Sequence, residues 1–106
     1  ALAGRWARES DTLKMFYIQN NNGMGEGMWA DTVYTYATPF TTTYSLRFPF
    51  LSVETETGRE CTVGIIEQTE KYLKLRIVNK SSGSTGKFIV RGVVFNANSQ
   101  IYGRYW

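Results

Sequence analysis

Few residues of this chain have the types and spacing that catalysis requires. The sequence contains no histidine, which excludes a Ser-His-Asp triad, a Cys-His pair and any zinc site that includes histidine. Glu54 and Glu56 stand two residues apart, a spacing that places two carboxylates on one face of a strand, where paired acids perform acid–base chemistry. They adjoin the Thr57-Gly58 turn, however, where carboxylates are usually solvated. We therefore expect no catalytic residues and a non-enzymatic protein.

Three other features that suggest chemistry have simpler interpretations. Cys61 opens an apolar stretch and no base is available to form its thiolate, so we expect a small buried hydrophobic residue. Residues 23–27 (Gly-Met-Gly-Glu-Gly) lead into a strand and no lysine follows, which indicates a flexible surface loop and not a phosphate-binding loop. Asn79-Lys80-Ser81 matches a glycosylation pattern so short that it recurs by chance. We expect no cofactor and no metal ion.

Aromatic side chains are the unusual part of the composition. Seven Tyr, six Phe and three Trp make up 15% of the 106 residues. Most should line the core or a subunit interface. The alternative is that a few stack on the apolar face of a ligand while neighbouring polar groups hydrogen-bond its hydroxyls, as sugar recognition requires. The loop over residues 20–29 combines these types, and the candidate ligand-binding residues are Asn21, Asn22, Glu26, Trp29 and Tyr34.

The secondary structure predicted around these residues consists of strands. Alternation of apolar and polar residues predicts half-buried strands at residues 44–50 and 72–78. The apolar face of the first consists of Tyr44, Leu46, Phe48 and Phe50. In the second, the inward residues are Leu73, Leu75 and Ile77, and the outward residues are Lys74 and Arg76.

Four more strands, at residues 13–19, 29–37, 61–68 and 87–95, carry apolar residues on both faces. Such strands are covered on both sides, within a sandwich or by a neighbouring subunit. A last short strand is expected from about residue 100. Gly64 and Gly92 interrupt two strands and predict a bulge or a close backbone approach, and Pro49 predicts an edge strand or a bulge.

Turn residues join these strands without helical periodicity, so the predicted fold class is all-β, a compact antiparallel β-sandwich. Residues 1–106 form one domain, in which residues 1–10 lack clean alternation and serve as an entry segment or the end of an upstream stalk. The formal charge of +3 is scattered along the chain, which argues against a nucleic-acid partner. No apolar run is long enough for a membrane span, so we expect no membrane insertion.

The order of several short motifs resembles a known family. Residues 5–17 combine a tryptophan-containing entry with an acidic residue, Thr and Leu that open a strand. An aromatic and proline-rich region follows at residues 36–40 and 47–50, and residues 101–106 (Ile-Tyr-Gly-Arg-Tyr-Trp) end the chain. In this order the chain resembles the C-terminal receptor-binding domains of bacteriophage tail fibres and related contractile-tail fibres. The same motifs are also compatible with the fibre head of a eukaryotic virus, which is likewise a compact β-sandwich on a trimeric shaft.

The resemblance implies a homotrimer at the distal end of a fibre, outside the cell, that attaches a virion to a host cell-surface receptor. A glycan is one of the receptor classes left open. Two alternatives also remain open: a monomeric carbohydrate-binding module or lectin, and a structural virion protein without a ligand. All three are compatible with a β-sandwich, because fold does not determine function.

Overall fold

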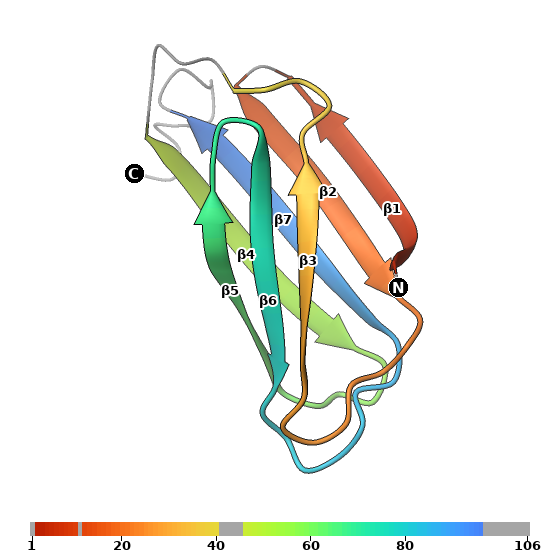
Figure 1. The fold of residues 1–106 in the computed structure, drawn as a ribbon. Helices are drawn as coiled ribbons and strands as arrows, with labels where there is room; N and C mark the ends of the chain where they lie inside the picture. The colour runs from red at the N-terminus through yellow and green to blue at the C-terminus, as the bar shows by residue number, and fades with distance from the viewer. Residues whose placement is uncertain (1, 11, 41–45, 97–106) are drawn as a thin grey trace.

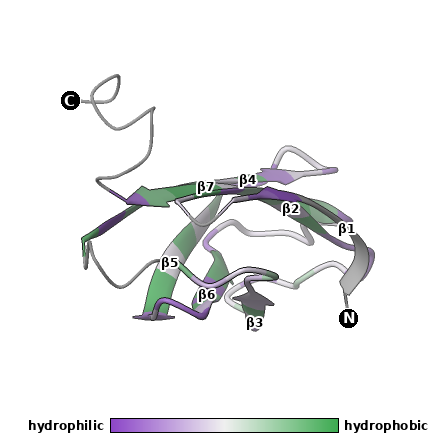
Figure 2. Cartoon of the chain, turned by 90° about the horizontal axis from the view of Figure 1, so that it is seen from above, coloured by the Kyte–Doolittle hydropathy of each residue, from purple (hydrophilic) through white to green (hydrophobic). Residues whose placement is uncertain are grey.

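The computed structural model describes residues 2–10, 12–40 and 46–96. Within these ranges the chain forms two antiparallel sheets, which lie as separate layers in Figure 2. The four-stranded sheet has the order β1 (Leu2–Glu9), β2 (Leu13–Asn20), β7 (Phe88–Asn96) and β4 (Arg47–Thr55). The three-stranded sheet has the order β3 (Trp29–Thr35), β6 (Tyr72–Asn79) and β5 (Cys61–Gln68) (Figure 1). The predicted all-β architecture of antiparallel sheets is confirmed.

The core lies between the two sheets. Leu73, Leu75 and Ile77 of β6 are buried, as their alternation predicts, and pack with alternate residues of β2 and β7. Gly92 permits a close approach at the centre of β7, because a Cβ atom there would lie 2.4 Å from Cζ of Phe16. The prediction for this glycine was a bulge or a close backbone approach; its close neighbours are instead side chains, the ring of Phe16 and a methyl group of Leu51.

Phe48 and Phe50 share one face of their strand, as predicted, but this apolar face does not meet the core. Strand β4 begins at Arg47, and its inward residues are Leu51 and Val53, which pack against the core. Phe48 and Phe50 lie on the opposite face, where their rings contact Phe95 at centroid distances of 5.5 and 5.8 Å. The alternation is real, but both faces of β4 carry apolar side chains, so the pattern alone does not tell which face is buried.

Other predicted boundaries differ in smaller ways. Residues 2–9, expected as an entry segment or stalk end, form an edge strand in which Trp6 pairs with Tyr17 of β2. Strand β3 ends at Thr35 rather than at residue 37. Pro49 does lie on an edge strand, since β4 ends the order of its sheet. The strand predicted from about residue 100, like Tyr44, lies outside the described residues.

The irregularity predicted near Gly64 falls slightly later in β5. The register shifts between Ile65 and Glu67, which marks a bulge there. Cys61 and Val63 pack against the core, but Cys61 is half-buried rather than buried, and Ile65, beside the bulge, is exposed. Desolvation raises the pKa of the Cys61 thiol. In the described ranges, no helix has the length and apolar character that crossing a membrane requires.

Candidate functional site

Three loops meet at one end of the sandwich: residues 21–28, 56–60 and 80–87, at the bottom of Figure 1. Backbone hydrogen bonds tie them together. The amide of Thr85 donates to the carbonyl of Met24 (3.0 Å), and the amide of Thr57 donates to the carbonyl of Thr85 (3.3 Å). We call these three loops the loop end. Because each loop is bonded to another, the loop end is a single structured surface on a β-scaffold.

Asn79 is buried beneath the loop end and hydrogen-bonds two of its loops. Its buried side-chain amide donates to the carbonyl oxygens of Met24, Gly25 and Gly83, at 2.7 to 3.0 Å. Its Oδ1 accepts hydrogen bonds from the amide and the hydroxyl of Ser81. The nitrogen that a glycosylation pattern would modify is therefore engaged inside the folded protein.

Three of the predicted ligand-binding residues, Asn21, Asn22 and Glu26, are exposed on the loop end. Asn20 fixes the start of this loop, because its Oδ1 accepts a hydrogen bond from the amide of Asn22 (2.9 Å). At Gly23 the absence of a side chain serves close packing, since a Cβ atom would lie 2.8 Å from the nitrogen of Gly86. The loop that the sequence predicts to be flexible is thus packed against residues 80–87.

Trp29 lies next to the loop end, on the outer face of the three-stranded sheet. Its side chain is 55% exposed, and Cζ of Arg76 lies 4.2 Å from the centroid of the indole ring. Arg76 also donates two hydrogen bonds to the carboxylate of Asp31, at 2.8 and 2.9 Å. These hydrogen bonds from Arg76 hold the pKa of Asp31 below its ordinary value, and they raise the pKa of Arg76. The three side chains form an ordered group of ring, cation and carboxylate, which we call the Trp29 group.

Asp31 and Arg76 were not among the residues selected from the sequence. Arg76 was predicted to point outward, and it does. It meets Asp31 and Trp29 because β3 and β6 are paired with Asp31 opposite Arg76. That register is not visible in the pattern of either strand alone, so only a correct pairing of the two segments could have identified the group.

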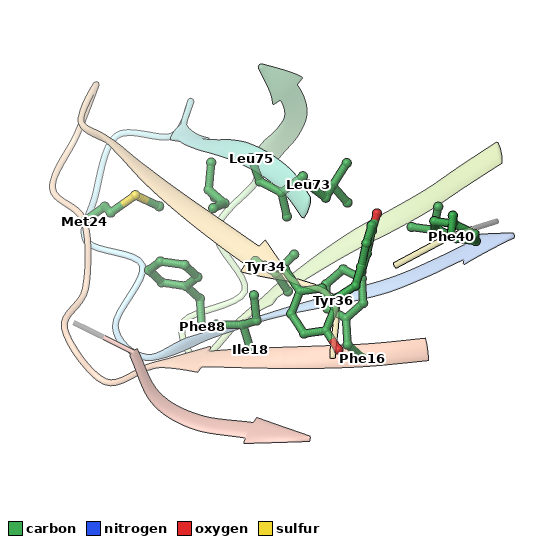
Figure 3. Packing of buried hydrophobic residues seen from close by; sticks show 12 residues of the cluster. Phe16, Ile18, Met24, Tyr34, Tyr36, Phe40, Leu73, Leu75 and Phe88 are labelled. Atoms are coloured by element: carbon green, nitrogen blue, oxygen red, sulfur yellow. The ribbon is translucent and has the colours of Figure 1, made fainter. Parts of the chain in front are cut away.

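Tyr34, the fifth candidate, lies in the core. It is 0% exposed and stacks on Phe16 with ring centroids 4.0 Å apart. Figure 3 shows both residues among the buried side chains. Its hydroxyl donates a hydrogen bond to the carboxylate of Glu9. The structure therefore does not bring the five candidates into one site. Asn21, Asn22 and Glu26 are on the loop end, Trp29 is beside it, and Tyr34 adds nothing to the surface.

A second surface of interest is the outer face of the four-stranded sheet. Met15, Val93 and Phe50 lie side by side across β2, β7 and β4, because each is paired with the next. Met15 is 36% and Phe50 is 40% exposed. A shallow apolar hollow of about 360 Å³ lies among them and Tyr17. We call this the outer apolar face. It explains why β2 and β7 have apolar residues on both sides.

The described residues contain no cluster of three or more His, Cys, Asp or Glu side chains that could hold a metal ion. No family model matches the chain, and no curated protein matches it.

Two solved structures are similar in fold. One is an N-truncated R1-type pyocin tail fibre, with a TM-score of 0.53 and 16% identity over 87% of this chain and 85% of that one. The other is a C-terminal part of the R1 pyocin fibre of P. aeruginosa, with a TM-score of 0.53 and 13% identity over 87% of this chain. This chain spans 28% of that second, longer structure. At these identities the likeness is one of fold, and the chain therefore shares its fold with part of a phage-tail-like fibre.

Proposed function

We propose that this chain is the non-enzymatic receptor-binding domain at the distal end of a trimeric viral fibre, of the bacteriophage tail-fibre type, and that it attaches the virion to a host cell surface. The observation that carries the proposal is the fold likeness to the pyocin tail fibre, which extends over most of both chains. The motif order at residues 5–17, 36–40 and 47–50 supports it independently.

The outer apolar face supports assembly into a homotrimer. Met15, Phe50 and Val93 leave apolar surface in contact with water on a domain of 106 residues, whose core is small. Cyclic association of identical subunits removes such a surface from water. Three copies also present three receptor sites together, which raises the avidity of weak individual contacts.

The loop end supports receptor binding. Its loops are bonded to one another through backbone groups and through Asn79, so little conformational entropy would be lost when a receptor binds. Its exposed residues include Asn21, Asn22 and Glu26, which offer both hydrogen-bond donors and acceptors.

The test combines the mass of the chain with its binding to cells. Light scattering at micromolar concentration is expected to give three times the 12.1 kDa of the single chain. The fluorescently labelled chain is expected to bind cells of a host strain in flow cytometry, and an excess of unlabelled chain should displace it. A monomer, or a lack of binding to every host strain in a panel chosen across surface types, would overturn the proposal.

A second candidate function is a monomeric lectin or carbohydrate-binding module. The observation that favours it is the Trp29 group, which combines an exposed ring with a carboxylate and a guanidinium. A monomeric mass together with binding to a glycan array would select this candidate. A trimer that binds neither cells nor glycans would select the structural virion protein.

A further inference from the structure

The outer face of the three-stranded sheet has a hollow beside Arg76. Asp31, Arg76 and Gly64 lie in one row across β3, β6 and β5, because Asp31 pairs with Arg76 and Arg76 pairs with Gly64. The guanidinium of Arg76 bonds to Asp31 and lies over Trp29, so its side chain leans toward β3. Gly64 has no side chain, and a Cβ atom there would meet nothing within 4 Å. The space above β5 is therefore open.

This open space is a hollow of about 330 Å³, and its walls are partly apolar. Its floor is Gly64, and its sides are Thr62, Ile66, Val78 and Arg76. Small-molecule sites occupy roughly 300–1,000 Å³, so the hollow has the size of a small subsite for one or two rings. Ile66 is exposed at its rim because the bulge in β5 leaves it without a paired residue on β6.

The polar wall of the hollow is preorganised. Two hydrogen bonds to Asp31 and the indole ring of Trp29 fix the position of the Arg76 guanidinium. A ligand that binds there does not have to order a flexible arginine, which removes the entropic cost of immobilising that side chain. Among the hydrogen bonds of the described residues, Nε and Nη2 of Arg76 are engaged, whereas Nη1 takes part in none.

The charge of this group selects the ligand class. Asp31 neutralises Arg76, so an anionic ligand would have to compete with a carboxylate already in place. Arg76 lines the hollow as a donor whose charge is already neutralised, and the hydroxyl of Thr62, on the same wall, can both donate and accept. Sugar hydroxyls act as donor and acceptor at once, and the apolar side chains of Val78 and Ile66 on the wall of the hollow match the C–H face of a sugar ring.

We propose that the hollow over Gly64, with Arg76, Asp31 and Trp29 beside it, is a binding subsite for a neutral pyranose. The proposal deepens the receptor-binding function and rests on it, because it names the chemistry of the receptor and a place for it on the sheet face next to the loop end. The subsite lies on β3, β5 and β6, whereas Asn21, Asn22 and Glu26 lie on the loop end.

The test is a titration of the isotope-labelled chain, followed by amide and side-chain NMR signals. The probes are a panel of methyl pyranosides that differ in ring configuration, with inorganic phosphate as the anionic comparison. At least one pyranoside should shift the amide signals of residues 62–66 and 76–78 and the indole signal of Trp29. Phosphate should shift none of them at equal concentration.

Two variants give the proposal its sharpest test. Gly64→Val fills the hollow with a side chain that is favourable in a strand. This variant should abolish the NMR shifts caused by the pyranoside while its melting temperature stays unchanged. Arg76→Met removes the polar wall and should weaken binding roughly tenfold or more. Arg91→Met is the matched control, because Arg91 forms an exposed ion pair of the same length with Glu54 (2.8 Å) on the other sheet, and the variant should bind the pyranoside as the wild type does.

Several outcomes would overturn the proposal. Phosphate shifts that depend on Arg76 would make the hollow an anion site. A Gly64→Val chain of altered mass in light scattering, with no pyranoside shift in the wild type, would make this face a contact between copies of the chain. A wild-type chain that binds host cells but responds to no pyranoside would leave the receptor-binding function in place and remove the subsite.

Discussion

At the scale of single residues, the most unusual group is a lysine without exposure to water. Lys14 is 0% exposed, and its Nζ lies 3.6 Å from the carboxylate of Glu9 and 4.9 Å from the ring centroid of Phe40. It also donates hydrogen bonds to the carbonyls of Ser10 and Thr38. The ion thus ties the segment that follows β3 to the β1–β2 hairpin.

Lys14→Met should therefore destabilise the fold although it adds apolar character. The substitution leaves the carboxylate of Glu9 and two carbonyls without their cation, and the free energy of unfolding should fall by about 3 kcal/mol. Urea denaturation followed by tryptophan fluorescence measures the change. The control is Lys80→Met, at an exposed lysine, which should change stability little. Equal stability of the two variants would show that the buried ion contributes nothing.

Glu9 adds a dependence of stability on pH. Burial raises the pKa of Glu9, but hydrogen bonds from Tyr34 and from the amides of Ala37 and Thr38, with the charge of Lys14, outweigh it and hold the pKa below 4.5. A carboxyl group with a lowered pKa in the folded state contributes stability above its unfolded pKa and loses it as the pH falls through the folded value. The melting temperature should fall as the pH decreases below about 4.5, and Glu9→Gln should flatten that decrease. The same pH profile in both proteins would contradict this role.

The residue scale also shows what the sequence could predict about the site. Trp29 and Tyr34 belong to one strand and have similar chemistry, and both were selected as ligand contacts. They lie five residues apart, so in an extended strand they face opposite sides. The odd spacing alone therefore indicates that Trp29 and Tyr34 cannot both contact one ligand on the same face of β3. The stacking of Arg76 on Trp29 could not have been foreseen, because it depends on how β3 pairs with β6.

At the scale of elements, the positions of the strands were predicted well, including the four with apolar residues on both faces, but the face that meets the core was predicted only where charged residues mark the other face. The buried side of β6 was correct because Lys74 and Arg76 mark the other side. The buried side of β4 was inverted, because the aromatic residues Phe48 and Phe50 pack on Phe95 outside the core. Hydrophobicity reports that a face is covered, but not whether the core or another surface covers it.

Gly92 and Gly64, each inside a strand, should respond in opposite ways to substitution by alanine. Gly92→Ala places a Cβ atom 2.4 Å from Phe16 and 3.0 Å from Leu51, so overpacking should lower the free energy of unfolding by about 2–3 kcal/mol. Gly64→Ala meets open space and should leave stability unchanged or raise it by up to about 1 kcal/mol. Denaturant midpoints of the two variants check this contrast, which similar losses at both positions would refute.

At the scale of the whole molecule, the sandwich places unlike surfaces on different sides. The loop end gathers three loops from distant parts of the chain. The two sheets form separate layers (Figure 2), and the outer apolar face and the Trp29 group lie on the outer sides of different sheets. The sequence predicts the strands and the turns, but it does not predict that these three loops meet. Their meeting depends on the sheet orders β1-β2-β7-β4 and β3-β6-β5, which are set by pairing between strands far apart in the sequence.

This separation of surfaces makes assembly and receptor binding independently testable. Met15→Glu puts a charge on the outer apolar face, beside Val93, and should convert the proposed trimer to a monomer, because burying an unpaired charge is costly. Val33→Glu is the matched control, an exposed apolar residue of β3 on the other sheet, and should leave the trimer intact. Light scattering measures both masses.

The monomer formed by Met15→Glu should keep its binding to individual ligand groups and lose avidity for cells, since three sites no longer act together. Its melting temperature should depend less on protein concentration than that of the wild type. A trimer that survives Met15→Glu but dissociates with Val33→Glu would place the subunit contact on the three-stranded sheet. In that case the hollow over Gly64 would be covered by a neighbouring copy and closed to any receptor.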